Sequence, residues 1–130
     1  MGNLRGFLEI LFRYFDADYG VMNEYGVGIS ESTCSAKIGS IACKYVGQRE
    51  KEKNCALLSI NELSKIALER SQSAREAVKL IGELATYYGF YGPEEAEFRG
   101  ESLKIIDKNE GFELEILASD KDGKSAIWVA

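Results

Sequence analysis

Residues 20–36 read GVMNEYGVGISESTCSA and determine how the rest of the chain is interpreted. Asn23 and Gly26 bracket a tight turn, because asparagine tolerates left-handed backbone geometry and glycine adopts a positive φ without steric cost. A short strand is predicted next, with Val27 and Ile29 on one face and small residues on the other. Small residues let a second backbone or a substrate approach closely. An ordinary hairpin turn explains the same residues, and the pattern alone favours it.

Two capped helices are predicted downstream of this strand. Residues 59–62 read SINE and residues 73–76 read SARE, and each is a capping box in which the serine oxygen accepts a backbone N–H while the glutamate reaches back. The first helix runs to about Arg70, and Gly89 ends the second. The short connection between them predicts an antiparallel or angled helix pair.

The remaining pattern predicts strands at the C-terminal end and a helix at the N-terminal end. Turn residues separate strands at 102–106, 112–117 and 126–130, which favours an antiparallel meander. Apolar residues at spacings of three and four predict a helix over residues 3–16. The fold class is therefore α+β, with the helix pair packed on a mostly antiparallel sheet.

Length and charge exclude several classes of function. The 130 residues allow one small domain. The net charge of -5 gives no electrostatic footprint for nucleic acid. No apolar run approaches the ~18 residues that a membrane-spanning helix needs.

Cysteine and histidine usage restricts the chemistry further. The three cysteines, Cys34, Cys43 and Cys55, have no CxxC spacing, so we expect reduced thiols and a cytoplasmic protein. Histidine is absent, which excludes Ser-His-Asp and Cys-His mechanisms within the chain and removes the commonest zinc ligand. We find no phosphate loop and no calcium loop, and we expect no metal or other cofactor.

Four stretches occur in an order and at a spacing that match a known family. They read MNEYGVGISESTCSA, INELSKIALERSQSAREAVKLIGELATYYGFYG, GESLKIIDKNEGFELEIL and GKSAIWVA, within residues 20–36 and 56–130. Together they resemble the cysteine dipeptidases of the dipeptidase A and secernin group. The resemblance implies an N-terminal-nucleophile hydrolase fold, αββα, with two antiparallel sheets between helical layers. Bile-salt hydrolases and penicillin V acylases are more distantly similar.

The resemblance also implies a mechanism, and the sequence departs from the family at the catalytic cysteine. Members use a cysteine at the mature N-terminus, with its own α-amine as the general base, so no histidine is needed. Residues 1–18 contain no cysteine. We therefore expect a partial hydrolase domain that lacks its nucleophile and is inactive alone. The alternative is a truncated, non-catalytic secernin-like homologue with an interaction or structural role.

The expected single partial domain divides into four segments. Residues 1–18 form a divergent, helix-like segment, 19–36 the turn and strand, 56–90 the helix pair, and 101–130 the antiparallel strands. Residues 37–54 do not match the family clearly.

The resemblance and the local pattern suggest a few site residues. Asn23 corresponds to the family's turn asparagine, which implies a place at the oxyanion or at the border of the active site; a purely structural turn residue is the alternative. Glu31 and Ser32 are candidates for contact with a substrate amine, or are simply a solvated strand end. Cys34 lies inside the chain without an adjacent base and is interpreted as a small packed thiol. Expected partners are short peptides or dipeptides, and open sheet edges favour self-association.

Overall fold

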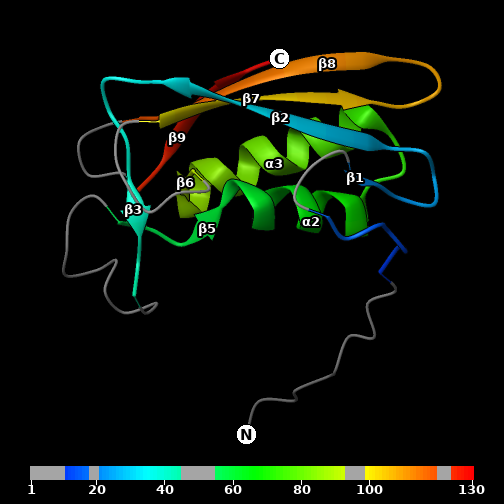
Figure 1. Ribbon diagram of the computed structural model, residues 1–130, viewed down its shortest axis with the longest axis horizontal. Helices are drawn as coiled ribbons and strands as arrows, with labels where there is room; N and C mark the ends of the chain where they lie inside the picture. The colour runs from blue at the N-terminus through cyan, green and yellow to red at the C-terminus, as the bar shows by residue number, and fades with distance from the viewer. Residues whose placement is uncertain (1–10, 18–20, 45–54, 93–98, 120–123) are drawn as a thin grey trace, which may run out of the picture.

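The computed structural model describes residues 11–17, 21–44, 55–92, 99–119 and 124–130, and its main element is a five-stranded antiparallel sheet (Figure 1). The strand order is β1-β2-β7-β8-β9. Two strands that are far apart in sequence, β2 and β7, pair along their full length at the centre. The strands are β1 (Val21–Met22), β2 (Gly28–Ser35), β7 (Arg99–Ile106), β8 (Gly111–Ala118) and β9 (Ala126–Val129).

Two helices, α2 (Ile60–Arg70) and α3 (Ala74–Tyr88), lie on the same side of this sheet (Figure 1). The first capping box is confirmed, with Ser59 and Glu62 bonded reciprocally. At α3 the Ser73 hydroxyl accepts from the Glu76 N–H as predicted. The Glu76 carboxylate, however, accepts from the N–H of Gln72 and not from that of Ser73. Gly89 ends α3 with a φ of 72°.

The core lies between the helices and one face of the sheet. We call this the covered face. It consists of the strand positions whose side chains point toward the helices, among them Ile29, Leu103, Ile105, Leu114 and Ile116. Cross-strand pairing aligns these positions, with Ile29 opposite Ile105 and Leu103 opposite Leu114. The helices contribute the buried residues Ile60, Leu63, Ala67, Leu68, Ala77, Val78, Ile81 and Ala85.

Two short parallel strand pairs connect the sheet to the helices. β3 (Ile41–Ala42) pairs with β4 (Cys55–Ala56), and β5 (Leu58–Ser59) pairs with β6 (Phe90–Tyr91). The first pairing brings Cys43 beside Cys55, and the two form a disulfide with a Cα–Cα distance of 4.9 Å. The expectation of reduced thiols is therefore wrong for these two cysteines, because spacing along the chain does not reveal a contact made by strand pairing.

The helix predicted over residues 3–16 is also wrong for the part that the structure describes. Residues 11–17 form no helix, and Tyr14 forms an antiparallel bridge with Asn23. The Phe15 N–H donates to the Met22 carbonyl at 3.0 Å. Backbone pairing along the outer edge of β1 thus satisfies groups that a helix would have bonded internally. Residues 1–10 and 18 lie outside the described residues.

Candidate functional site

The Asn23 side chain is the most heavily bonded feature of the turn between β1 and β2. It is buried, and its Oδ1 accepts from the N–H groups of Tyr25 and Val27, each at 3.0 Å. Its Nδ2 donates to the carbonyl oxygens of Leu68 at 2.9 Å and Ser71 at 2.8 Å. The side chain therefore holds the turn closed and also ties it to the end of α2.

This bonding pattern defines what Asn23 can offer to a ligand. Both amide protons are already donated to carbonyls of the helix end. An oxyanion would receive one of them only by displacing the Leu68 or Ser71 carbonyl, and a buried polar group that loses its partner is costly. In this arrangement the residue acts directly on the shape of the turn.

The sheet face turned away from the helices carries a different set of side chains. We call it the open face. Its polar centre consists of Ser30, Ser32, Ser102, Lys104 and Glu113, which neighbour one another across β2, β7 and β8. Apolar residues flank this centre on both sides and are largely exposed: Met22 and Ile106 at one end, and Leu117, Ile127 and Val129 at the other.

A groove of about 330 Å³ lies at the end of the open face nearest the Asn23 turn. Gly28 forms its floor, because Gly28 is paired with both Met22 and Ile106 in the sheet and has no side chain of its own. Lys104 and Ser30 lie on the same groove. The arrangement combines an apolar hollow with one cation at its rim.

The cation belongs to a small polar network at the centre of the open face. The Lys104 Nζ lies 3.4 Å from the Glu113 Oε1, and the same oxygen accepts from the Ser102 hydroxyl at 3.1 Å. Lys104 and Glu113 are both exposed, and an exposed ion pair contributes little to stability. A ligand can compete for either partner.

The two other predicted contact residues point in opposite directions. Glu31 shares the side of β2 that carries Ile29, and its Oε1 accepts from the Thr33 hydroxyl at 2.5 Å. Ser32 is exposed on the open face, opposite Ser102. Four strand residues, ~13 Å, separate Ser32 from the Gly28 end of the strand. The structure therefore does not bring Asn23, Glu31 and Ser32 into one site.

None of the three cysteines is set up as a nucleophile in this structure. Cys43 and Cys55 are joined to each other. Partial burial raises the pKa of the Cys34 thiol, and the nearby carboxylates of Glu115 and Glu101 raise it further. A raised pKa leaves less of the reactive thiolate at neutral pH. Among the described residues, no group of three or more cysteine and acidic side chains is arranged to hold a metal ion.

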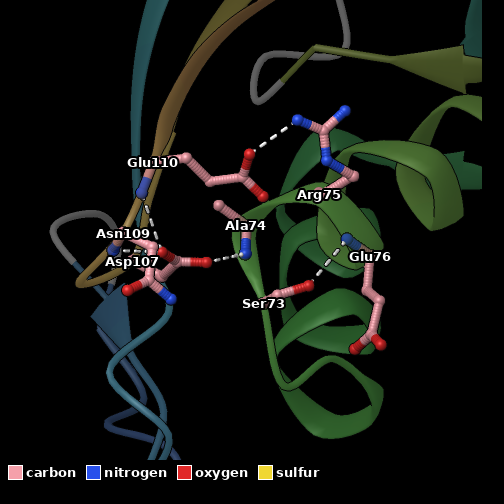
Figure 2. A network of polar contacts seen from close by, with 7 residues as sticks. All are labelled: Ser73, Ala74, Arg75, Glu76, Asp107, Asn109 and Glu110. Atoms are coloured by element: carbon pink, nitrogen blue, oxygen red, sulfur yellow. Dashed lines mark hydrogen bonds and ion pairs between the residues drawn. The ribbon is translucent and has the colours of Figure 1, made fainter.

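A second polar network, at the turn between β7 and β8, was not predicted from the sequence (Figure 2). The Asp107 carboxylate accepts from the Ala74 N–H at the start of α3 at 2.7 Å, and from the N–H groups of Asn109 and Glu110. These hydrogen bonds, that from Ala74 first, lower the pKa of Asp107. Arg75 pairs with Glu110 at 2.6 Å. The network fixes α3 to the sheet.

Comparison with known proteins identifies a family whose model matches the chain. Residues 12–130 match the family model described as Peptidase family C69. No curated protein matches the chain. Neither helix among the described residues has the length and the apolar run needed to cross a bilayer.

Proposed function

Because the chain belongs to peptidase family C69, we propose that its sheet and helix pair form one half of an N-terminal-nucleophile sandwich that hydrolyses dipeptides. The family match over residues 12–130 carries this proposal. The open face is a second support. A sheet with helices on one side and exposed apolar residues on the other is what remains when one half of an αββα sandwich is viewed alone.

The chemistry proposed is attack on the amide carbon by the thiolate of an N-terminal cysteine. The cysteine's own α-amine, which titrates near pH 8, takes the thiol proton. The amine of the substrate leaves with a proton, and water then hydrolyses the acyl-enzyme. Cys34 does not fit this role, because its nitrogen is a backbone amide within β2 and the pKa of its thiol is raised. We therefore propose that the nucleophile is not among these 130 residues and that they do not hydrolyse peptides alone.

In this proposal Asn23 borders the active site and acts through the turn. Its four side-chain hydrogen bonds fix the backbone that leads into β2. Ser32 remains a candidate for substrate contact because it faces the side on which the second sheet would pack. Glu31 would reach a substrate only from the other side of β2.

The test has two arms that use the same dipeptide panel. The purified chain is assayed first, and we expect no release of amino acids. The chain is then expressed with the coding sequence that flanks it in its genome, and we expect turnover that is lost when an N-terminal cysteine is replaced by serine. Turnover by the chain alone that disappears in Cys34→Ser would overturn the assignment of the nucleophile.

One observation favours the second candidate, a non-catalytic homologue with an interaction or structural role. Residues 12–15 lie along the outer edge of β1, and the Glu24 N–H donates to the Arg13 carbonyl at 2.9 Å. A chain that covers its own sheet edge is protected from pairing with other strands. Flanking sequence without any cysteine at the start of a strand, together with no turnover in the second arm, would favour this candidate over the peptidase.

A further inference from the structure

We propose that the groove beside the Asn23 turn binds the C-terminal residue of a dipeptide, with an apolar side chain in the hollow and the carboxylate on Lys104. This inference rests on the proposed function, and it adds the preferred substrate class. The groove is lined by Val21, Met22, Gly28, Ile29, Ser30, Lys104 and Ile106.

The shape of the groove depends on the missing side chain at Gly28. A Cβ built there would lie 3.4 Å from Ile106 Cγ1 and 3.5 Å from Met22 Cε, which is ordinary van der Waals contact. A larger side chain at this position would therefore fill the hollow from below. Its volume of about 330 Å³ is at the lower end of the range for small-molecule sites, and it has room for a side chain of the size of leucine.

The walls of the groove are apolar side chains that remain exposed in this structure. Met22 is 44% exposed and Ile106 is 51% exposed, and both pair with Gly28 on the open face. The hydrophobic effect favours covering such surface with an apolar group.

The position of Lys104 identifies which apolar ligand fits. Its Nζ belongs to an exposed pair with Glu113 at 3.4 Å, so a ligand carboxylate competes with a weak partner. A charge-assisted bond from an ammonium to a carboxylate is stronger than a neutral one. An apolar side chain within two bonds of a carboxylate is the chemistry of the last residue of a peptide. The apolar groove matches the side chain of such a residue, and the Lys104 ammonium matches its carboxylate.

The rest of the dipeptide has room in a neighbouring groove. Met22 lines both hollows, and the second, of about 240 Å³, is also lined by Arg13, Phe15, Asn23 and Glu24. A ligand seated beside Lys104 can therefore extend past Met22 toward the turn. This is the direction in which the proposed active-site border lies.

Binding to the isolated chain tests the proposal without any need for turnover. The ¹⁵N-labelled chain is titrated with Gly-Leu, with Gly-Gly, which lacks the side chain, and with Gly-leucinamide, which lacks the carboxylate. We expect saturable shifts of the Gly28, Ser30 and Ile106 amides with Gly-Leu. The two analogues should bind roughly tenfold more weakly, since each lacks one of the two recognised groups.

Three variants localise the effect. Lys104→Met should weaken Gly-Leu binding but leave Gly-leucinamide unchanged. Gly28→Val should abolish binding, and Gly28→Ala should weaken it; circular dichroism checks that both fold. Ile127→Ala, at the far end of the same face, is the matched control and should bind as the parent chain does.

The outcomes separate this inference from the proposed function. Equal binding of Gly-Leu and Gly-Gly, or shifts confined to the Ile127 end, would overturn the subsite. Dimerisation that shifts the groove amides without ligand would also overturn it and would assign the groove to a second copy of the chain. Peptidase activity in the flanked protein with no response in the groove would leave the function and remove the subsite. Groove binding with no peptidase activity in the flanked protein would leave the binding groove and remove the proposed function.

Discussion

The two faces of the five-stranded sheet are built from alternate residues of the same strands, yet they serve different ends. On the covered face, Leu103 and Leu114 are paired and fully buried under the helices. On the open face, Lys104 and Glu113 are the adjacent pair, and both side chains are exposed. A shift of one residue in the register would exchange these environments. The comparison shows that the apolar content of a strand is not by itself a measure of the core.

The open face also keeps apolar side chains that the two helices leave exposed. Ile106 and Ile127 lie at its two ends, each more than half exposed. Single exposed apolar residues are common on proteins, but clusters that line a groove mark binding surfaces. The covered face therefore carries the stability of the described fold, and we propose that the open face carries recognition; the following predictions test that division.

The largest difference is expected from truncating one apolar residue on each face. Leu103→Ala removes a fully buried side chain and should lower the free energy of unfolding by about 3 kcal/mol. Ile106→Ala removes a half-exposed one and should cost less than about 1 kcal/mol. Urea unfolding followed by circular dichroism measures both. Similar losses would mean that the open face is buried in solution, and the division between the faces would fail.

A smaller loss is expected at the turn that leads into the central strands. Asn23→Ala removes four hydrogen bonds and leaves buried carbonyls at the end of α2, so we expect a loss of about 2 kcal/mol in the same measurement. Ser32→Ala, on the open face of β2, is the control and should leave the urea midpoint unchanged. An Asn23→Ala chain as stable as its parent would show that the side chain is free for another role.

Local features of the sequence predicted α2, α3 and the four longest strands, β2, β7, β8 and β9, correctly. The serine-glutamate spacing at Ser59 and Ser73 fixed the helix starts, and Gly89 fixed an end, because capping acts within a few residues. The antiparallel strands from residue 99 onward were recognised from alternation and turn residues. These features depend on near neighbours, which a sequence displays directly.

Contacts between distant residues were out of reach. The pairing of β2 with β7 joins residues about 70 positions apart, and it creates the groove by placing Ile106 beside Gly28. The disulfide between Cys43 and Cys55 likewise follows from the β3–β4 pairing. Asn23 was identified as a turn residue, but its bonds to Leu68 and Ser71 depend on where α2 ends in space. The apolar spacing at residues 11–15 predicts a helix. In the structure these residues instead form backbone hydrogen bonds along the edge of β1.

A pH-dependent loss of stability is expected on the helix side of the sheet. Hydrogen bonds from Ala74 and then Asn109 lower the pKa of Asp107 in the folded chain, so ionised Asp107 stabilises the fold at neutral pH. That contribution is complete above the unfolded pKa of about 3.9 and is lost as the pH falls through the lower, folded pKa. Asp107→Asn should therefore lower the urea midpoint at pH 7, and the gap from the parent chain should close below about pH 4.

The matched control for this prediction lies on the open face. Glu113→Gln removes an exposed carboxylate whose partner is also exposed, and it should leave the urea midpoint at pH 7 nearly unchanged. A gap between Asp107→Asn and its parent that stays constant down to the acid range would mean that the carboxylate's charge is not what anchors α3.

The smallest effect concerns a reaction rate on the open face and leaves stability unchanged. Burial, Glu115 and Glu101 raise the pKa of Cys34, so iodoacetamide should label it more slowly at pH 7 than it labels free cysteine. Cys43 and Cys55 should not react unless they are first reduced, because they are bonded to each other. Glu115→Gln removes one of the two nearby charges and should speed the labelling. Glu113→Gln, on the same strand and face but not among the groups that shift this pKa, should not. Labelling faster than free cysteine would reveal an activated thiol, and the open face would then offer a nucleophile as well as a groove.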